Sequence, residues 1–213
     1  MRPQPGVVAV NECDTKIDTC CLGKNFMVLE YTLRTADVYT YDPSITPIKD
    51  VPIVTGATAW DHPTTNETFI IIINEALYYG DKLDHSLINP NQIRSFGIDF
   101  WDNPFDKERG LKIEADEHVS IGLTTQGTKD MFESRVPADK ELNNCHRIQI
   151  TARQEWNPPS VRLSQVNPRM HRADTQDGLK EKLQAMIPRI SKIATYDQTL
   201  EDIVPANNYT SRE

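Results

Sequence analysis

The sequence predicts a mainly β protein with few short helices, on three observations. The first hundred residues contain several short runs of β-branched and aromatic residues that end at turn residues. Four successive isoleucines at residues 70–73 form the most apolar run, which predicts a strand buried on both faces at the centre of the core. Through much of the second half, apolar and polar residues alternate, which is typical of half-exposed antiparallel strands.

The elements of the first third follow in order. An apolar run at residues 7–10 predicts the first strand, and the loop after it carries Asp14. Runs at 26–33 and 36–41 are β-branched and aromatic, and Arg34-Thr35 separates them. This spacing predicts a β-hairpin that turns at residues 34–35.

Two further elements have clear local signals. Residues 51–60 predict a strand in which Gly56 indicates a bulge or a bend. Asn89 is a good N-cap residue, Pro90 suits the first helical position, and Gly97 suits the end of a helix. The sequence therefore predicts a short helix over residues 90–96.

A polar connector at residues 98–104 predicts a domain boundary, so that residues 1–104 form the first domain. Residues 105–165 are interpreted as a β-rich extension, either a small separate unit or a continuation of the first sheet, with a helical turn at 137–142. Residues 166–213 are locally basic and predict a marginal amphipathic helix with a flexible tail, or a linker towards a next module.

Composition excludes several classes of function. The chain has 213 residues and a formal net charge of −8, which argues against direct nucleic-acid binding. We expect no membrane span, because no apolar run approaches ~18 residues, and no signal peptide, because the N-terminus lacks a charged stretch followed by an apolar one. An intracellular, cytoplasmic location follows, with reduced thiols. We predict no cofactor and no metal site, because the histidines lack zinc spacing: His62, His85, His118, His146 and His171.

The loop at residues 12–23 carries the strongest functional signal. An apolar strand that leads into Asp14-Thr15, with a second Asp-Thr pair at Asp18, is typical of the active-site loop of an aspartic protease. A catalytic carboxylate of this kind works in a pair about 3 Å apart that shares one proton. We find no second Asp-Thr/Ser-Gly loop in the chain, so the partner carboxylate is expected from a second copy in a two-fold homodimer.

The sequence also resembles a known family. Residues 14–19 are similar to the Asp-Thr/Ser-Gly-Ala-Asp-x pattern of retroviral and retrotransposon proteases, and residues 74–80 and 83–97 resemble the end of copia-type retrotransposon proteases. Residues 132–137 and 156–158 also look like Pol-polyprotein fragments of copia-type elements. This resemblance implies a retropepsin-like (acid protease) β-barrel domain that cleaves a Gag-Pol-type polyprotein substrate, within a virus-like particle if the element is active.

The resemblance assigns roles to four residues. Asp14 supplies the catalytic carboxylate, Thr15 ties the two loops of the dimer together, and Asp18 holds the substrate backbone. Lys16 stands where the family has glycine, against which the substrate lies. A lysine there obstructs the cleft or places a cation beside the dyad, which disfavours the shared proton.

Other interpretations of this loop stay open. Asp18 rather than Asp14 is the catalytic residue if the loop is aligned on the second Asp-Thr pair. Both pairs cap turns through side-chain to backbone hydrogen bonds if they have no catalytic role. Cys20 or Cys21 could pair with a histidine as a thiol nucleophile. Finally, the chain could be a degenerate, non-catalytic polyprotein fragment that acts as a dimerising or spacer module.

Overall fold

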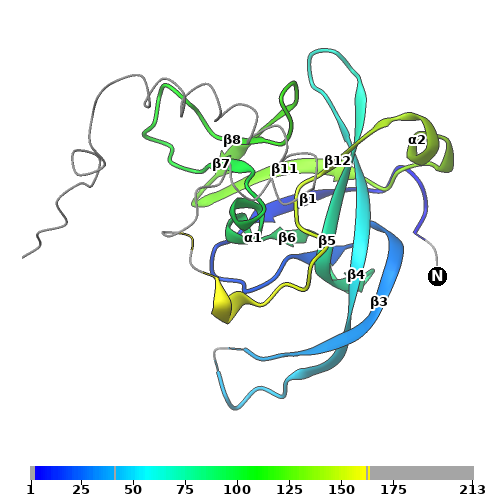
Figure 1. Cartoon of the computed structure of the whole chain (residues 1–213), viewed down its shortest axis with the longest axis vertical. Coiled ribbons are helices and arrows are strands. Elements are labelled where there is room, and N and C mark those ends of the chain that lie inside the picture. The colour runs from blue at the N-terminus through cyan, green and yellow to red at the C-terminus, as the bar shows by residue number, and fades with distance from the viewer. Residues whose placement is uncertain (1–2, 41, 162, 164–213) are drawn as a thin grey trace, which may run out of the picture. The chain divides into compact units, whose positions relative to one another are not determined.

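The computed structural model describes residues 3–40, 42–161 and 163, and these form a mainly β structure with few short helices, as the sequence predicts (Figure 1). The helix and tail expected over residues 166–213 lie outside the described residues. The helical elements are α1 (Pro90–Ser95), α2 (Asp139–Asn144) and the 3-10 turn η1 (Pro158–Ser160). The strands are β1 (Val8–Cys13), β2 (Cys21–Gly23), β3 (Met27–Val38), β4 (Ile48–Asp61), β5 (Thr68–Gly80), β6 (Ser86–Ile88), β7 (Asp99–Trp101), β8 (Lys112–Glu114), β9 (Ser120–Gly122), β10 (Thr124–Gln126), β11 (Lys129–Arg135) and β12 (His146–Gln149).

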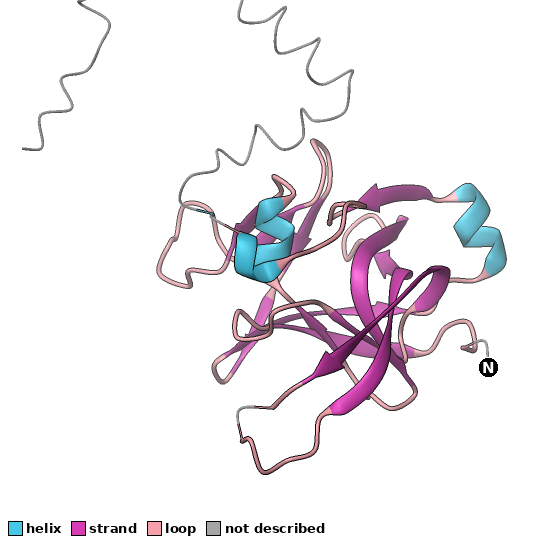
Figure 2. Cartoon of the chain, turned by 60° about the horizontal axis from the view of Figure 1, so that its bottom comes forward, coloured by secondary structure: helices cyan, strands magenta, loops and turns pink. Residues whose placement is uncertain are grey.

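The larger sheet has the order β10-β11-β1-β6-β2-β5-β4-β3, and β12 also pairs with β5. A pairing between β11 and β4, with Arg135 opposite Ala59, closes six of these strands into a ring. Strands β7, β8 and β9 form a separate small sheet. Figure 2 shows the two short helices at opposite sides of the strands. The core therefore lies between strands, and helices cover little of it.

Strand β5 is buried on both faces, as its four isoleucines predict. Ile70 and Ile72 pack with Ala57, Val136 and their neighbours on one face. The alternate isoleucines at 71 and 73 belong to the largest hydrophobic cluster on the other face. Side chains alternate between the two faces of a strand, so a continuous apolar run is what a strand with two covered faces requires.

Strand β6 lies between β1 and β2, parallel to the first and antiparallel to the second. The loop at residues 14–20 therefore connects two strands that are separated by a third. The strand that precedes Asp14 belongs to the same sheet as residues 70–73, as we expect if the core supports this loop. Helix α1 begins directly after β6, and Asn89 caps it by accepting hydrogen bonds from two backbone amides, which confirms the predicted helix.

The hairpin predicted at residues 34–35 is wrong. Strand β3 runs through this position, and both of its halves pair with β4, from Met27 opposite Ala57 to Val38 opposite Ile48. The chain passes residues 32–35 in an irregular stretch of the strand, where Leu33 has a φ of 65°. The residues that suggested a turn thus form a bulge, which inserts extra residues into a strand without ending it.

Strands of the second half complete the sheet of the first half. Strand β11 is antiparallel to β1, and β12 is parallel to β5, so the pairing continues across the boundary expected at residue 104. The expected polar connector contains β7, in which Phe100 is buried and its two neighbours are half-buried. Helix α2 forms where the helical turn at 137–142 is predicted.

A buried polar network holds the strands around the loop together. The Asn25 amide nitrogen donates to the Asn11 side-chain oxygen at 2.9 Å and to the Ser134 hydroxyl at 2.9 Å. The hydroxyls of Ser86 and Thr58 donate to Asn25 Oδ1 at 2.7 Å and to Ser134 Oγ at 2.6 Å. Buried polar groups are costly unless they are paired, so this network favours one arrangement of β1, β4, β6 and β11.

Candidate active site

The carboxylate of Asp14 is held by its own loop. Its backbone N–H donates to the Ile88 carbonyl of β6 at 2.9 Å, and one carboxylate oxygen accepts the Lys16 N–H at 2.8 Å. Asp14 is half-buried, whereas Thr15 and Lys16 are exposed. The arrangement is a turn closed by an aspartate side chain.

Helix α1 fixes the far end of the loop. The Asn89 side-chain amide donates to the Ile17 carbonyl at 2.7 Å, and Gln92 Oε1 accepts the Cys20 N–H at 2.9 Å. The Asn89 backbone N–H also points at Cys20 Sγ, 3.2 Å away. Two side chains of one short helix therefore hold the backbone of the loop on both sides of Asp18.

The loop cysteines are poor nucleophiles in this environment. Burial raises the pKa of the Cys20 thiol to about 12, although the hydrogen bond from the Asn89 backbone amide lowers this pKa. Burial raises the pKa of Cys21 to about 12 as well, and the nearby negative charge of Asp14 adds to this. Burial also raises the pKa of Cys13 far above its ordinary value. Since the thiolate is the reactive form, the geometry disfavours the thiol-nucleophile interpretation.

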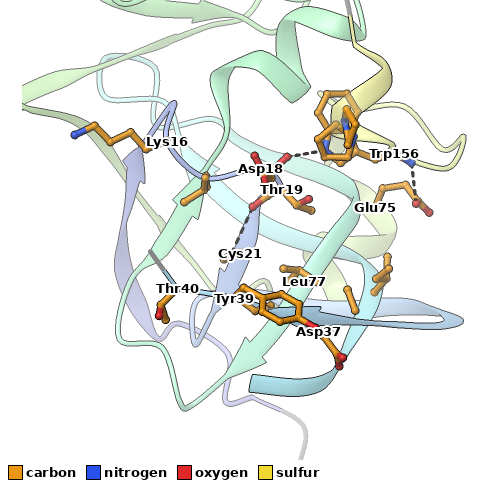
Figure 3. A pocket seen from close by; sticks show the side chains of 16 residues that line it. Lys16, Asp18, Thr19, Cys21, Asp37, Tyr39, Thr40, Glu75, Leu77 and Trp156 are labelled. Atoms are coloured by element: carbon orange, nitrogen blue, oxygen red, sulfur yellow. Dashed lines mark hydrogen bonds between the residues drawn. The ribbon is translucent and has the colours of Figure 1, made fainter. Parts of the chain in front are cut away.

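A pocket of about 740 Å³ opens beside the loop (Figure 3). Lys16 and Asp18 lie in its lining, whereas Asp14 and Thr15 lie outside that lining. In Figure 3, the Lys16 side chain extends away from Trp156, which lies close to Asp18. The rest of the lining comes from the loop, the end of β3, the centre of the sheet and the segment after β12: Ile17, Thr19, Cys21, Ala36, Asp37, Val38, Tyr39, Thr40, Ile53, Glu75, Leu77, Trp156, Pro158 and Pro159.

Glu75 is a pocket residue that the sequence analysis missed. It is only 4% exposed, and its backbone φ is 53°, a conformation that non-glycine residues rarely adopt. The β4–β5 register shifts between Val54 and Gly56, and the extra residue belongs to β5, so the bulge lies in the partner of the strand in which Gly56 predicts it. Arg34 Nη2 lies 2.6 and 2.7 Å from the two carboxylate oxygens of Glu75. The available signal was a glutamate two positions after the apolar run at residues 70–73.

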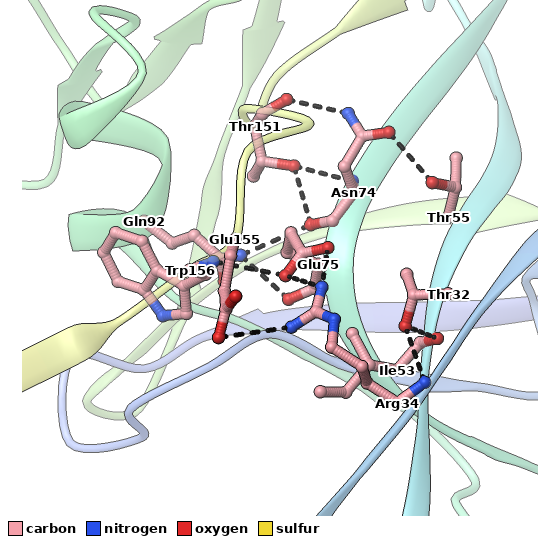
Figure 4. A network of polar contacts seen from close by, with 10 residues as sticks. All are labelled: Thr32, Arg34, Ile53, Thr55, Asn74, Glu75, Gln92, Thr151, Glu155 and Trp156. Atoms are coloured by element: carbon pink, nitrogen blue, oxygen red, sulfur yellow. Dashed lines mark hydrogen bonds and ion pairs between the residues drawn. The ribbon is translucent and has the colours of Figure 1, made fainter.

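Glu75 and Trp156 connect the pocket to the loop, and Figure 4 shows Glu75 with its partners Arg34, Gln92 and Trp156. The Glu75 carbonyl accepts the Gln92 side-chain amide at 3.0 Å, and its carboxylate accepts the Trp156 backbone N–H at 3.1 Å. The Trp156 indole N–H donates to the Asp18 carbonyl at 2.7 Å. Gln92 also accepts the Cys20 N–H, so these contacts form a closed ring through residues 18–20 of the loop, Gln92, Glu75 and Trp156.

Comparison of the chain with protein-family models, curated proteins and solved structures finds no match. Within the described part of the chain, helices are too short or too polar to span a bilayer.

Proposed function

We propose that this chain is a retropepsin-like aspartic endopeptidase of a copia-type retrotransposon. Each copy supplies one half of the active site, and the site forms between two copies. The substrate is an extended segment of a Gag-Pol-type polyprotein. No cofactor takes part, because two carboxylates and water suffice for this reaction.

One observation carries this proposal. Asp14 stands at the end of a core strand, with its carboxylate oriented by the Lys16 amide, in a loop that passes over β6 and is held by α1. In the family that the sequence resembles, the glycine at the position of Lys16 uses its amide in the same way. In pepsin-like folds a helix packs beneath the active-site loop; here α1 follows β6, and Asn89 and Gln92 bind the backbone of the loop.

The mechanism follows from the chemistry of a carboxylate pair. In the dimer, Asp14 of one copy and Asp14 of the other share one proton. The ionised carboxylate takes a proton from water, which attacks the peptide carbonyl, and the protonated one gives its proton to the leaving nitrogen. The exposed Thr15 is accessible to the other copy, and Asp18 at the pocket holds the substrate backbone.

The test is cleavage of an extended peptide by a set of variants. Lys16→Gly removes the cation beside the dyad, and we expect cleavage to rise at least about tenfold over the wild type near neutral pH. Adding Asp14→Asn to Lys16→Gly abolishes cleavage, whereas adding Asp18→Asn weakens it only in part. The frame on Asp14 is wrong if Lys16→Gly gains nothing while wild-type activity survives Asp14→Asn and is lost in Asp18→Asn.

The second candidate function is that of a degenerate polyprotein fragment, a dimerising or spacer module without catalysis. Two observations favour it: Lys16 replaces the glycine of the family, and Asp14 lies outside the lining of the adjoining pocket. This alternative predicts that the wild type and Lys16→Gly are both inactive at every concentration. The variants above therefore separate the two functions.

A further inference from the structure

The segment after β12 does not leave the body of the protein at once. We name residues 151–160 the strap. Directly before it, the Ile150 N–H donates to the Ile72 carbonyl at 3.0 Å. The Thr151 hydroxyl accepts the Asn74 N–H at 2.7 Å, and the Thr151 carbonyl accepts the Asn74 side-chain amide at 2.8 Å. The strap is thus fixed to β5 immediately before the bulge at Glu75.

The strap then crosses from β5 to the loop. Trp156 is bound at two points, through its backbone N–H to the Glu75 carboxylate and through its indole N–H to the Asp18 carbonyl. Arg34 holds the same carboxylate from the β3 side and lies 3.7 Å from Glu155 of the strap. A buried carboxylate that accepts several charge-assisted hydrogen bonds is a strong anchor. Glu75 lines the pocket, and its backbone has a left-handed conformation.

The pocket is bounded by the strap and is not filled by it. Trp156, Pro158 and Pro159 line the cavity of about 740 Å³ together with Ala36 and Val38 of β3. This volume falls within the ~300–1,000 Å³ typical of ligand pockets. The remaining floor is largely apolar, with Ile17, Ile53 and Leu77. An apolar concavity with a few fixed polar groups suits large apolar side chains of an extended peptide.

We infer that the strap is a structural wall of the peptide-binding pocket, and that Glu75 is the residue that positions it. The pocket selects large apolar side chains, and part of this selectivity comes from Trp156, Pro158 and Pro159. Residues of the β-rich extension are therefore part of the binding site. For the class of ligand, this inference rests on the proposed endopeptidase function.

Binding without cleavage tests this inference. The full chain carries Asp14→Asn throughout, so that the peptide stays intact. The probe is a fluorescein-labelled Ala-Leu-Phe-Ala-Lys-amide peptide, followed by fluorescence anisotropy and compared with Ala-Ala-Ala-Ala-Lys-amide. We expect the first peptide to bind more tightly. Glu75→Gln and Trp156→Phe each weaken its binding by about tenfold, because the first removes the charge that pairs with Arg34 and the second removes the indole donor to the Asp18 carbonyl. Both variants also reduce the preference for the apolar peptide.

Matched controls separate positioning from general damage. Glu117→Gln makes the same change at an exposed residue outside the strap and the pocket, and Trp101→Phe makes the same change in β7; both leave binding within about twofold. If Trp156→Phe fails to fold, a Pro158→Ala, Pro159→Ala double variant changes the same wall and is expected to lower the preference for the apolar peptide.

The outcomes divide clearly. The inference is overturned if the variants bind as the parent does, if they bind more tightly because the strap excludes the peptide, or if the parent does not bind the apolar peptide. A third outcome separates the two proposals: the parent binds the apolar peptide and the variants lose binding, but the chain that retains Asp14 never cleaves a peptide. In that case the inference stands and the proposed catalysis fails.

Discussion

Asn89 performs two tasks at once, and replacing it separates them. Its side-chain oxygen accepts the N–H groups of Asn91 at 2.8 Å and Gln92 at 3.3 Å, and its amide donates to the Ile17 carbonyl at 2.7 Å. Asn89→Ala loses the helix cap, which contributes about 1 kcal/mol, and the loop hydrogen bond, which contributes about 1 kcal/mol more. We therefore expect Asn89→Ala to lower the free energy of unfolding by about 2 kcal/mol.

Asn89→Asp is the matched control for the cap. Aspartate accepts the same two amides but cannot donate to the Ile17 carbonyl when it is ionised. It should therefore lose only about 1 kcal/mol. The assay is urea unfolding at pH 7, with the slope of each curve checked for constancy, together with hydrogen exchange of the amides at residues 15–19. Both variants should exchange faster than the wild type in this loop.

The reasoning fails if Asn89→Asp is as stable as the wild type and protects the loop equally well, because the bond to Ile17 would then contribute nothing. It also fails if Asn89→Ala and Asn89→Asp are equally destabilised, because the cap would then have no separate effect.

Two further predictions concern stability. Ile71→Ala should lower the free energy of unfolding by about 2–5 kcal/mol, since Ile71 is fully buried. Leu33→Ala, at a side chain that is 96% exposed, should change it by less than about 0.5 kcal/mol. Equal effects of the two variants in urea unfolding would contradict the core assignment. Burial raises the pKa of Cys20 and Cys21 from 9.0 to about 12, so the folded state holds protons that the unfolded chain releases, and stability should fall above about pH 9 by up to ~1.4 kcal/mol per pH unit for each thiol. Cys20→Ala should make the loss of stability between pH 9 and pH 11 less steep, and an unchanged slope would refute this cause.

Local signals in the sequence predict the parts of the fold that depend on local chemistry. The N-cap at Asn89 and Pro90 places α1, and the apolar run at 70–73 places the central strand. Gly56 stands beside the register shift in β4–β5 pairing, although the extra residue belongs to β5. Each of these features is set by neighbouring residues or by burial of one strand, so the pattern is sufficient to predict it.

The remainder depends on contacts between distant residues. A turn at residues 34–35 is plausible locally, but pairing of the whole of β3 with β4 overrides it and converts the interruption into a bulge. Trp156 and Asp18 are 138 positions apart, and the pocket exists only because β12 pairs with β5 and leads the chain back over the loop. No short-range pattern predicts that meeting, or the anchoring role of Glu75.

The central claim is that one copy holds half of an active site. The most direct measurement is the initial rate of peptide cleavage by the Lys16→Gly chain over about a hundredfold range of subunit concentration. A site shared by two copies predicts a rate that rises with the square of the subunit concentration at the low end, where monomers predominate. Adding an excess of chain that also carries Asp14→Asn should then lower the rate. A rate that is linear in concentration throughout, and unaffected by the added Asp14→Asn chain, would contradict the claim.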